Sequence, residues 1–355
     1  MSPGGLTARR LVAHCAVALL ATLVLAVCAP LLGGGISIKR ALAELPWRSS
    51  YDSPDALIFW GTRVPRVLAA LVTGGALAIA GLATQAVLRN ALAEPYILGI
   101  SAGAGMGKAA SLFMLGHCGW WTGGVGTLGF CFLGAMIPVL LLQGMASRQR
   151  RFSPVTLLLV GVMINIVLSA VMMLIQTFAN PQTARQVQLW WLGSLDIVGY
   201  RSLLLLAPFI AAGAIVLMLR GRTMNLLGFD TATASHLGLH VEREVRVLLW
   251  SAALLASAAV ALAGPIGFVG LLVPHVLRLV FGVDNRLLAP LCVVYGAAFL
   301  LLCDMVGWRG AGLISSTSAA ELPVGVVTAL LGGPLFLFLL VRGSGSAVNP
   351  KQVSL

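Results

Sequence analysis

Long apolar stretches, separated by short polar connections, follow one another along nearly the whole chain. Most of them approach the roughly 20 apolar residues that a helix needs to cross a bilayer. The first, Leu11 to Leu32, is longer than the roughly 7–15 residues of a signal-peptide core, so it predicts a retained helix. The pattern predicts ten membrane-spanning helices, at 11–32, 64–88, 96–115, 124–146, 154–178, 201–220, 246–263, 266–282, 287–307 and 322–342.

Two stretches, 33–62 and 180–200, are too polar to span a bilayer, and we expect short surface helices there. Trp47 lies in the first stretch, and Trp190 and Trp191 lie in the second. Tryptophan is enriched at the depth of the lipid headgroups. Both stretches are therefore predicted to lie at the membrane surface.

The composition indicates a chain that is surrounded mainly by lipid. It is 59% hydrophobic and 10% charged, with a mean hydropathy of +0.98, against roughly 45–50% and about 25% in soluble domains. This excludes a soluble globular enzyme. We predict an all-α polytopic membrane protein with one transmembrane domain over residues 1–355, which leaves no room for a large catalytic domain.

The formal charge of +12 would suggest nucleic-acid binding in a soluble chain. Here the basic residues are scattered between apolar runs, so we expect no nucleic-acid partner. Placing both termini in the cytoplasm puts most basic residues on that side, as membrane proteins usually do. The six cysteines form no CxxC pair, and His236 and His240 have only loop glutamates nearby. We therefore expect neither a metal site nor a cofactor in this chain.

Residues 99–111 contain two patterns that suggest enzyme chemistry. Gly107 and Lys108 resemble the end of a phosphate-binding loop, but Ala109 stands where that loop requires Ser or Thr. Gly-Ile-Ser-Ala-Gly at 99–103 matches the serine-hydrolase pattern, so an intramembrane serine protease using Ser101 is an alternative. We favour helix packing, because small residues recur every four positions. They are Gly99, Gly103, Gly107 and Ser111, with a second stripe at Ala70, Gly74 and Ala78.

Three longer motifs occur in a fixed order. The first contains Arg-Val-Pro-Arg at 63–66, Arg-Asn-Ala-Leu-Ala-Glu-Pro at 89–95 and Leu-Gly-Ile at 98–100. The second is Gly-Pro-Ile-Gly-Phe-Val-Gly-Leu-Leu-Val-Pro-His at 264–275, and the third is Glu-Leu-Pro-Val-Gly at 321–325. Together they resemble the binding-protein-dependent ABC permeases that import iron chelates and vitamin B12. That family usually has proline where this chain has Ala91.

The resemblance implies the type II ABC importer permease fold and an assembly in the bacterial inner membrane. Two copies of the chain would enclose the pathway, two ATP-binding subunits would hold ATP and Mg, and a periplasmic substrate-binding protein would dock outside. A metal chelate (ferric siderophore, haem or cobalamin) would cross by alternating access. The chain itself would be a permease and not an enzyme. A secondary transporter without an ATPase is a further alternative.

The resemblance also implies roles for particular residues. Arg63, Arg66 and Arg309 would dock the binding protein, because arginine pairs well with carboxylates, unless they only snorkel at helix ends. The loop at 226–241 would hold a coupling helix for the ATPase at about 230–239, capped by Asp230, unless it is only a solvated loop. The implied coupling residues are Asp230, Ala232, Ala234, Ser235, His236, Leu237 and Gly238. The implied cytoplasmic gate comprises Asn90, Leu92, Ser153, Pro154, Val155 and Thr156.

Two charged residues fall in or near the predicted spans, Asp304 and Lys108. Charge is costly in lipid, so we expect each to face the pathway or a partner group. In the related permeases an arginine usually follows the aspartate by four residues, whereas Trp308 stands there and Arg309 comes next. This shifts the alignment of Arg309 by about one residue.

Overall fold

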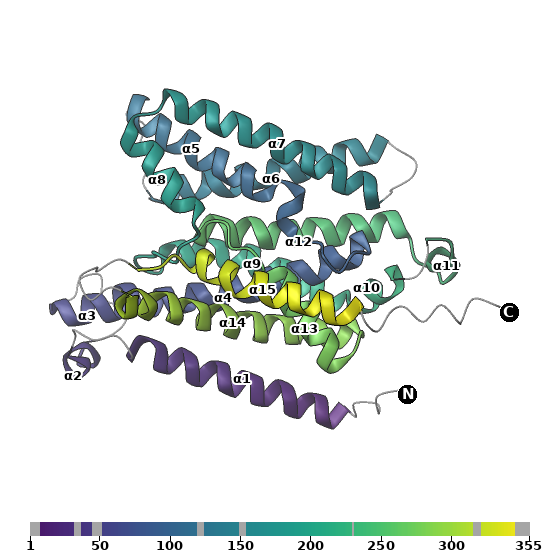
Figure 1. Ribbon diagram of the computed structural model, residues 1–355, viewed down its shortest axis with the longest axis horizontal. Helices are drawn as coiled ribbons and strands as arrows, with labels where there is room; N and C mark the ends of the chain where they lie inside the picture. The colour runs from purple at the N-terminus through teal and green to yellow at the C-terminus, as the bar shows by residue number, and fades with distance from the viewer. Residues whose placement is uncertain are drawn as a thin grey trace.

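The computed structural model describes residues 8–31, 37–44, 52–118, 124–148, 154–228, 231–314 and 321–344, and all regular elements within these ranges are helical. The predicted all-α fold is confirmed. The longer helices run roughly side by side (Figure 1). They are α1 (Ala8–Leu31), α4 (Val64–Leu88), α5 (Ile100–Cys118), α6 (Gly124–Arg148), α7 (Pro154–Phe178), α9 (Arg201–Leu219), α12 (Val241–Ala263), α13 (Val269–Phe281), α14 (Asn285–Ile314) and α15 (Val324–Ser344).

Seven stretches of the described chain are long and apolar enough to cross a membrane. They are His14–Leu31, Pro54–Leu88, Gly124–Met145, Val155–Phe178, Arg201–Leu219, Val241–Ala263 and Asn285–Arg309. The apolar parts of α5, α13 and α15 are shorter. A protein with several membrane spans is thus confirmed, and the count of ten stays a prediction.

Short helices lie in both polar stretches, as expected. They are α2 (Ile38–Leu42), α3 (Pro54–Ile58) and the π-helix η1 (Phe59–Arg63) in the first, and α8 (Pro181–Trp191) in the second. Three more lie outside those stretches: the 3₁₀ helix η2 (Pro95–Leu98), α10 (Gly221–Leu227) and α11 (Thr231–His236). The second span begins earlier than predicted, because η1 joins α3 to α4. Pro65 has no N–H to donate to the carbonyl four residues before it. That carbonyl, of Gly61, accepts a hydrogen bond from the N–H of Gly199 at 2.8 Å instead.

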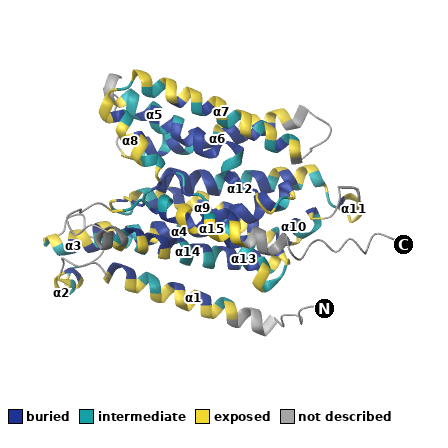
Figure 2. Ribbon diagram, viewed as in Figure 1, coloured by how far each residue is buried: buried dark blue, intermediate teal, exposed yellow. Residues whose placement is uncertain are grey.

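Helices α4 and α12 form the centre of the bundle, where Figure 2 shows buried residues concentrated. The spans that contain them are 83% and 78% buried, against 17% for those of α1, α7 and α9. Helix α4 packs against α14, α12 and α13, while α5 packs against α6 and α7. The peripheral helices therefore present apolar side chains outward, as a lipid-facing surface requires.

The central helices approach each other at glycines. A Cβ on Gly74 would lie 2.3 Å from the carbonyl oxygen of Gly296, and one on Gly107 would lie 2.1 Å from that of Phe130. Ser111 of α5 also shares a hydrogen bond with Thr127 of α6 at 2.9 Å. The packing interpretation of both small-residue stripes is confirmed, since only glycine allows these backbones so close.

The two ends of the bundle differ. Helices α10 and α11 lie at the same end as the start of α1 and the end of α15, and we call this the α11 end (Figure 1). Helices α2, α3 and α8 lie at the opposite end, the α3 end.

Candidate functional site

A buried charge cluster lies at the α3 end. Arg66, two residues into α4, donates from Nε and Nη2 to the carboxylate of Asp304 on α14, at 2.9–3.1 Å. Its Nη1 forms an ion pair with Glu321. The side chains of Arg66 and Asp304 are 14% and 5% exposed. Asp304 therefore pairs with a group inside the bundle, one of the two roles expected for it.

The neighbouring Arg63 also bonds to a group inside the bundle. It is buried and donates from Nη1 to the carbonyl oxygen of Pro30 in α1 at 3.0 Å. The guanidinium groups of Arg63 and Arg66 lie 5.1 and 5.9 Å from the ring centre of Trp308, within cation–π range. Of the predicted docking arginines, Arg309 alone is exposed in this structure. Docking at these residues stays a prediction.

The predicted gate residues Asn90 and Leu92 lie at the α11 end, in the loop at 89–99 between α4 and α5, which we call the gate loop after that prediction. Arg89 ends α4 in the left-handed conformation, with φ 48°. Asn90 then folds its side chain back, and its Oδ1 accepts a hydrogen bond from the N–H of Leu92 at 2.9 Å. Asn90 is half-buried and Leu92 is exposed. The loop is therefore an ordered turn with an apolar side chain at its tip.

The second predicted gate segment begins α7. Ser153 lies outside the described residues, Pro154 is the first residue of α7, Val155 is exposed and Thr156 is half-buried. The structure brings the gate loop onto α7 about two turns further on, because a Cβ on Gly161 would lie 2.8 Å from the carbonyl oxygen of Ile97. The two segments thus belong to one region, although their contact is not between the residues predicted for the gate.

Glu94 holds this loop to the connection between α12 and α13, a contact that the sequence analysis missed. Its Oε1 accepts a hydrogen bond from the N–H of Phe268 at 2.7 Å. Phe268 itself has a left-handed backbone conformation, with a φ of 69°. Tyr96 makes a similar contact, with its hydroxyl accepting from the N–H of Ile266 at 3.1 Å. The sequence signal was an acidic residue before a proline, in a segment otherwise poor in charge.

Burial raises the pKa of Glu94 to about 7, partly opposed by the N–H of Phe268. Between its usual value of 4.5 and 7, the folded state therefore binds this proton more tightly than the unfolded state. We expect the free energy of unfolding to fall on the order of 3 kcal/mol as pH rises through this window, as far as Glu94 contributes. Glu94→Gln should remove that part of the slope, measured by thermal unfolding between about pH 5 and about pH 7.5.

Glu242→Gln is the matched control, because Glu242 is an exposed glutamate at the same end of the bundle. It should leave the pH dependence as it is in the unchanged chain. Equal slopes in Glu94→Gln and the unchanged chain would contradict the assignment.

The predicted coupling helix ends earlier than expected. Helix α11 covers Thr231–His236 and does not extend to 239, while Asp230 lies outside the described residues, as does the side chain of Ala232. Gly238, with φ 83°, and the hydrogen bond from the N–H of Leu239 to the carbonyl oxygen of Ala234 end the helix there.

The coupling segment offers an exposed surface next to a concave one. Ala234 is buried, while the other members that can be placed are exposed, and the side chain of Leu237 is an apolar group 58% exposed. A cleft of about 570 Å³ lies beside it, lined by Ser235, Leu239, His240, Val241, Glu242, Arg243 and Arg246. An exposed leucine beside a charged cleft is a surface that a partner protein could cover.

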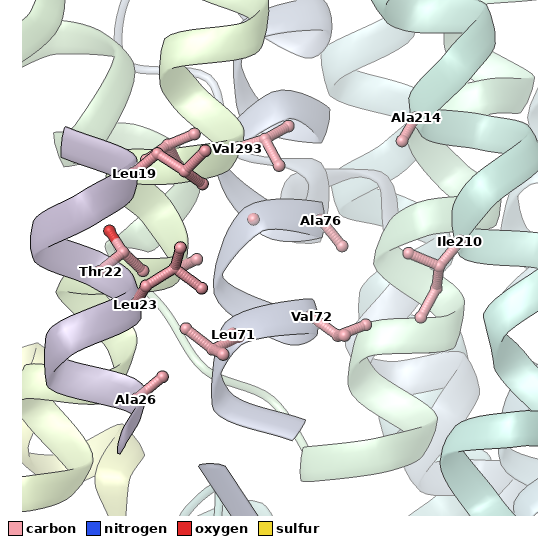
Figure 3. Close-up of a pocket in the computed structure, with 13 residues that line it drawn as sticks. Leu19, Thr22, Leu23, Ala26, Leu71, Val72, Ala76, Ile210, Ala214 and Val293 are labelled. Atoms are coloured by element: carbon pink, nitrogen blue, oxygen red, sulfur yellow. The ribbon is translucent and has the colours of Figure 1, made fainter. Parts of the chain in front are cut away.

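A separate cavity of about 330 Å³ lies between α1, α4, α9 and α14. Figure 3 shows Leu23 and Ala26 of α1 opposite Leu71 of α4, whereas Val72 of α4 points away from α1 toward Ile210 of α9. Thr22 supplies the one hydroxyl in the lining, and that hydroxyl donates to the carbonyl oxygen of Ala18 at 2.8 Å. Without a convergent polar group, this cavity has no means to orient a polar chelate.

The other candidate residues lie on α5. Ser101 is the second residue of this helix, and η2, not a strand, precedes it. Its buried hydroxyl makes no hydrogen bond to the residues that the structure describes. The hydrolase pattern requires a strand-to-helix elbow, so the protease alternative loses its structural basis. Lys108 is half-buried beside Cys131 of α6.

The fold and this arrangement define a helical membrane protein with an ordered loop and an exposed short helix at one end. The profile of the FecCD transport family matches residues 16–342, and the chain belongs to this family of ABC transporter permeases. It is 38% identical over 314 residues to the uncharacterized ABC transporter permease protein YvrB of Bacillus subtilis, covering 86% of each chain. It is 39% identical over 301 residues to the vitamin B12 import system permease protein BtuC of Escherichia coli, covering 83% of this chain and 88% of the relative.

A solved structure agrees with this assignment. It is a metal-chelate type ABC transporter in an inward-facing conformation, 26% identical in sequence. It superposes with a TM-score of 0.76 over 91% of this chain and 98% of its own. The expectation of an ABC importer permease is therefore confirmed.

Proposed function

We propose that two copies of this chain form the pathway of an ATP-driven importer that carries a metal chelate from periplasm to cytoplasm by alternating access. The observation that carries the proposal is the near full-length similarity to relatives named as vitamin B12 import permeases. A corrinoid is the first substrate to test, with ferric siderophores and haem next. ATP and Mg belong to two partner ATP-binding subunits, and a periplasmic substrate-binding protein delivers the chelate.

Uptake by the reconstituted complex tests this function. Proteoliposomes with the chain, its ATP-binding subunits and the binding protein should accumulate radiolabelled cyanocobalamin, a ferric siderophore or haem only when ATP is supplied. Ser101→Ala should transport normally, because a serine nucleophile has no part in import. Uptake of none of the three chelates, or uptake without ATP, would contradict the proposal.

We further propose that the α11 end faces the cytoplasm of a bacterium, across its inner membrane. The excess of basic residues on that side and the position of α11 support this orientation. Reporters fused after Leu355 or inserted at 228–230, between α10 and α11, should give a cytoplasmic signal, and one near Ser50 should give a periplasmic signal. A periplasmic signal from the insertion at 228–230 would contradict both the orientation and the span count.

The outer arginines remain the proposed docking site for the binding protein. Arg66 already pairs with Glu321, whose side chain is 42% exposed. A carboxylate of a docking protein would therefore compete with Glu321 for the same guanidinium. Arg309 is exposed on the same side of the membrane in the proposed orientation. The gate loop and α11 are the proposed inner gate and coupling element.

A further inference from the structure

The gate loop begins with a side chain that reaches into the neighbouring cytoplasmic helix. Arg89 Nε donates to the carbonyl oxygen of Leu227, the last residue of α10, at 2.8 Å. The last carbonyls of a helix have no partner within the helix. The next N–H, of Gly228, bonds to the carbonyls of Asn225 and Leu226 instead. A cationic donor is favoured at such a helix end, so Arg89 caps α10.

Helix α10 is also fixed to the start of α14. Asn225 Nδ2 donates to Asp284 Oδ1 at 2.6 Å, and Asn225 Oδ1 accepts from the N–H of Asn285 at 2.8 Å. A Cβ on Gly221 would lie 2.7 Å from the Cα of Arg286, so these backbones are in contact. The contacts at Gly221 and Asn225 therefore join α10 and the start of α14 into one packed unit.

Arg89 lies between the proposed gate and the proposed coupling segment. Helix α10 ends at Leu227, shortly before α11 begins at Thr231. Arg89 itself directly precedes Asn90, the first residue of the proposed gate. Arg89 ends α4 in a left-handed conformation, and its side chain links this turn to the end of α10.

We propose that Arg89 is the positioning residue that joins the coupling segment to the inner gate, through its hydrogen bond to the end of α10. The inference rests on the proposed function, because it assumes that α11 receives the motion of an ATPase. It adds the connection by which that motion reaches Asn90 and Leu92.

A spectroscopic measurement of the gate tests the proposal in the whole complex. A spin label on Leu92→Cys in both copies reports the distance between the two gates, with and without ATP and vanadate. The same complex lacking Leu92→Cys gives the background from native cysteines. Arg89→Gln should lower the ratio of shifted to unshifted gate distances in the presence of nucleotide about tenfold, the order expected for loss of a hydrogen bond to a charged group. The ATP-binding subunits should still co-purify and hydrolyse ATP.

Two further variants separate the connection from general stability. Arg89→Lys keeps a cationic donor and should retain at least about half of the shift. Arg222→Gln removes an exposed arginine on the same helix α10 and should behave as the unchanged chain does. A full shift in Arg89→Gln would overturn the proposal, and so would joint loss of the shift and of the ATP-binding subunits. Absence of a shift in the unchanged chain would overturn alternating access itself, which separates the two failures.

Discussion

Asp304→Asn should lower the free energy of unfolding by about 3–5 kcal/mol, because it leaves the guanidinium of Arg66 charged in a buried site without its main partner. Asp304 is 5% exposed and accepts from both Nε and Nη2 of Arg66. The pair also joins α4 to α14, two helices in extensive contact. Thermal unfolding of the purified protein in detergent measures the effect.

Glu321→Gln is the matched control, since it removes the other carboxylate partner of the same arginine. Its side chain is 42% exposed, so the loss should be about 0–1 kcal/mol. Replacing the whole pair, Arg66→Met with Asp304→Leu, should recover most of the stability lost in Asp304→Asn, because no buried charge remains. Equal losses for Asp304→Asn and Glu321→Gln would show that burial does not set the strength of this pair.

Local periodicity predicted much of the fold. Apolar runs located the long helices, and small residues at every fourth position predicted the close contacts at Gly74 and Gly107, because helix geometry relates those positions directly. Sequence periodicity did not predict the change of helix type before α4 or the early end of α11. The π-helix before α4 has a carbonyl, that of Gly61, which bonds to Gly199 far along the chain, and α11 ends early at the left-handed Gly238.

The candidate site was predictable only in part, because its contacts join distant segments. Arg66 and Asp304 are separated by 238 positions, so no spacing rule could pair them. A signal did exist, since an acid and a base that both lie in apolar runs are each costly in lipid unless they meet. The contacts of Glu94 and Arg89 are with backbone groups of Phe268 and Leu227. Such contacts leave no trace in the identity of the partner residue.

Leu237→Asp should reduce ATP-driven uptake by about two orders of magnitude while the chain folds normally. Leu237 is 58% exposed in the single chain, so a carboxylate there remains hydrated until a partner covers it. If the ATPase receives α11 in a groove, that carboxylate would be buried at a cost of several kcal/mol unless it finds a partner charge. Uptake, co-purification of the ATP-binding subunits and stimulation of ATP hydrolysis by the binding protein measure the outcome.

Val283→Asp is the matched control for this change. Val283 is another exposed apolar residue, 77% exposed, in the connection between α13 and α14. Its neighbour Asn285 bonds to α10, so it lies at the same end of the bundle as α11. Val283→Asp should import normally, because the added charge stays in water. Normal import and normally stimulated hydrolysis in Leu237→Asp would place the coupling element elsewhere, with the connection at 148–152 the next segment to test.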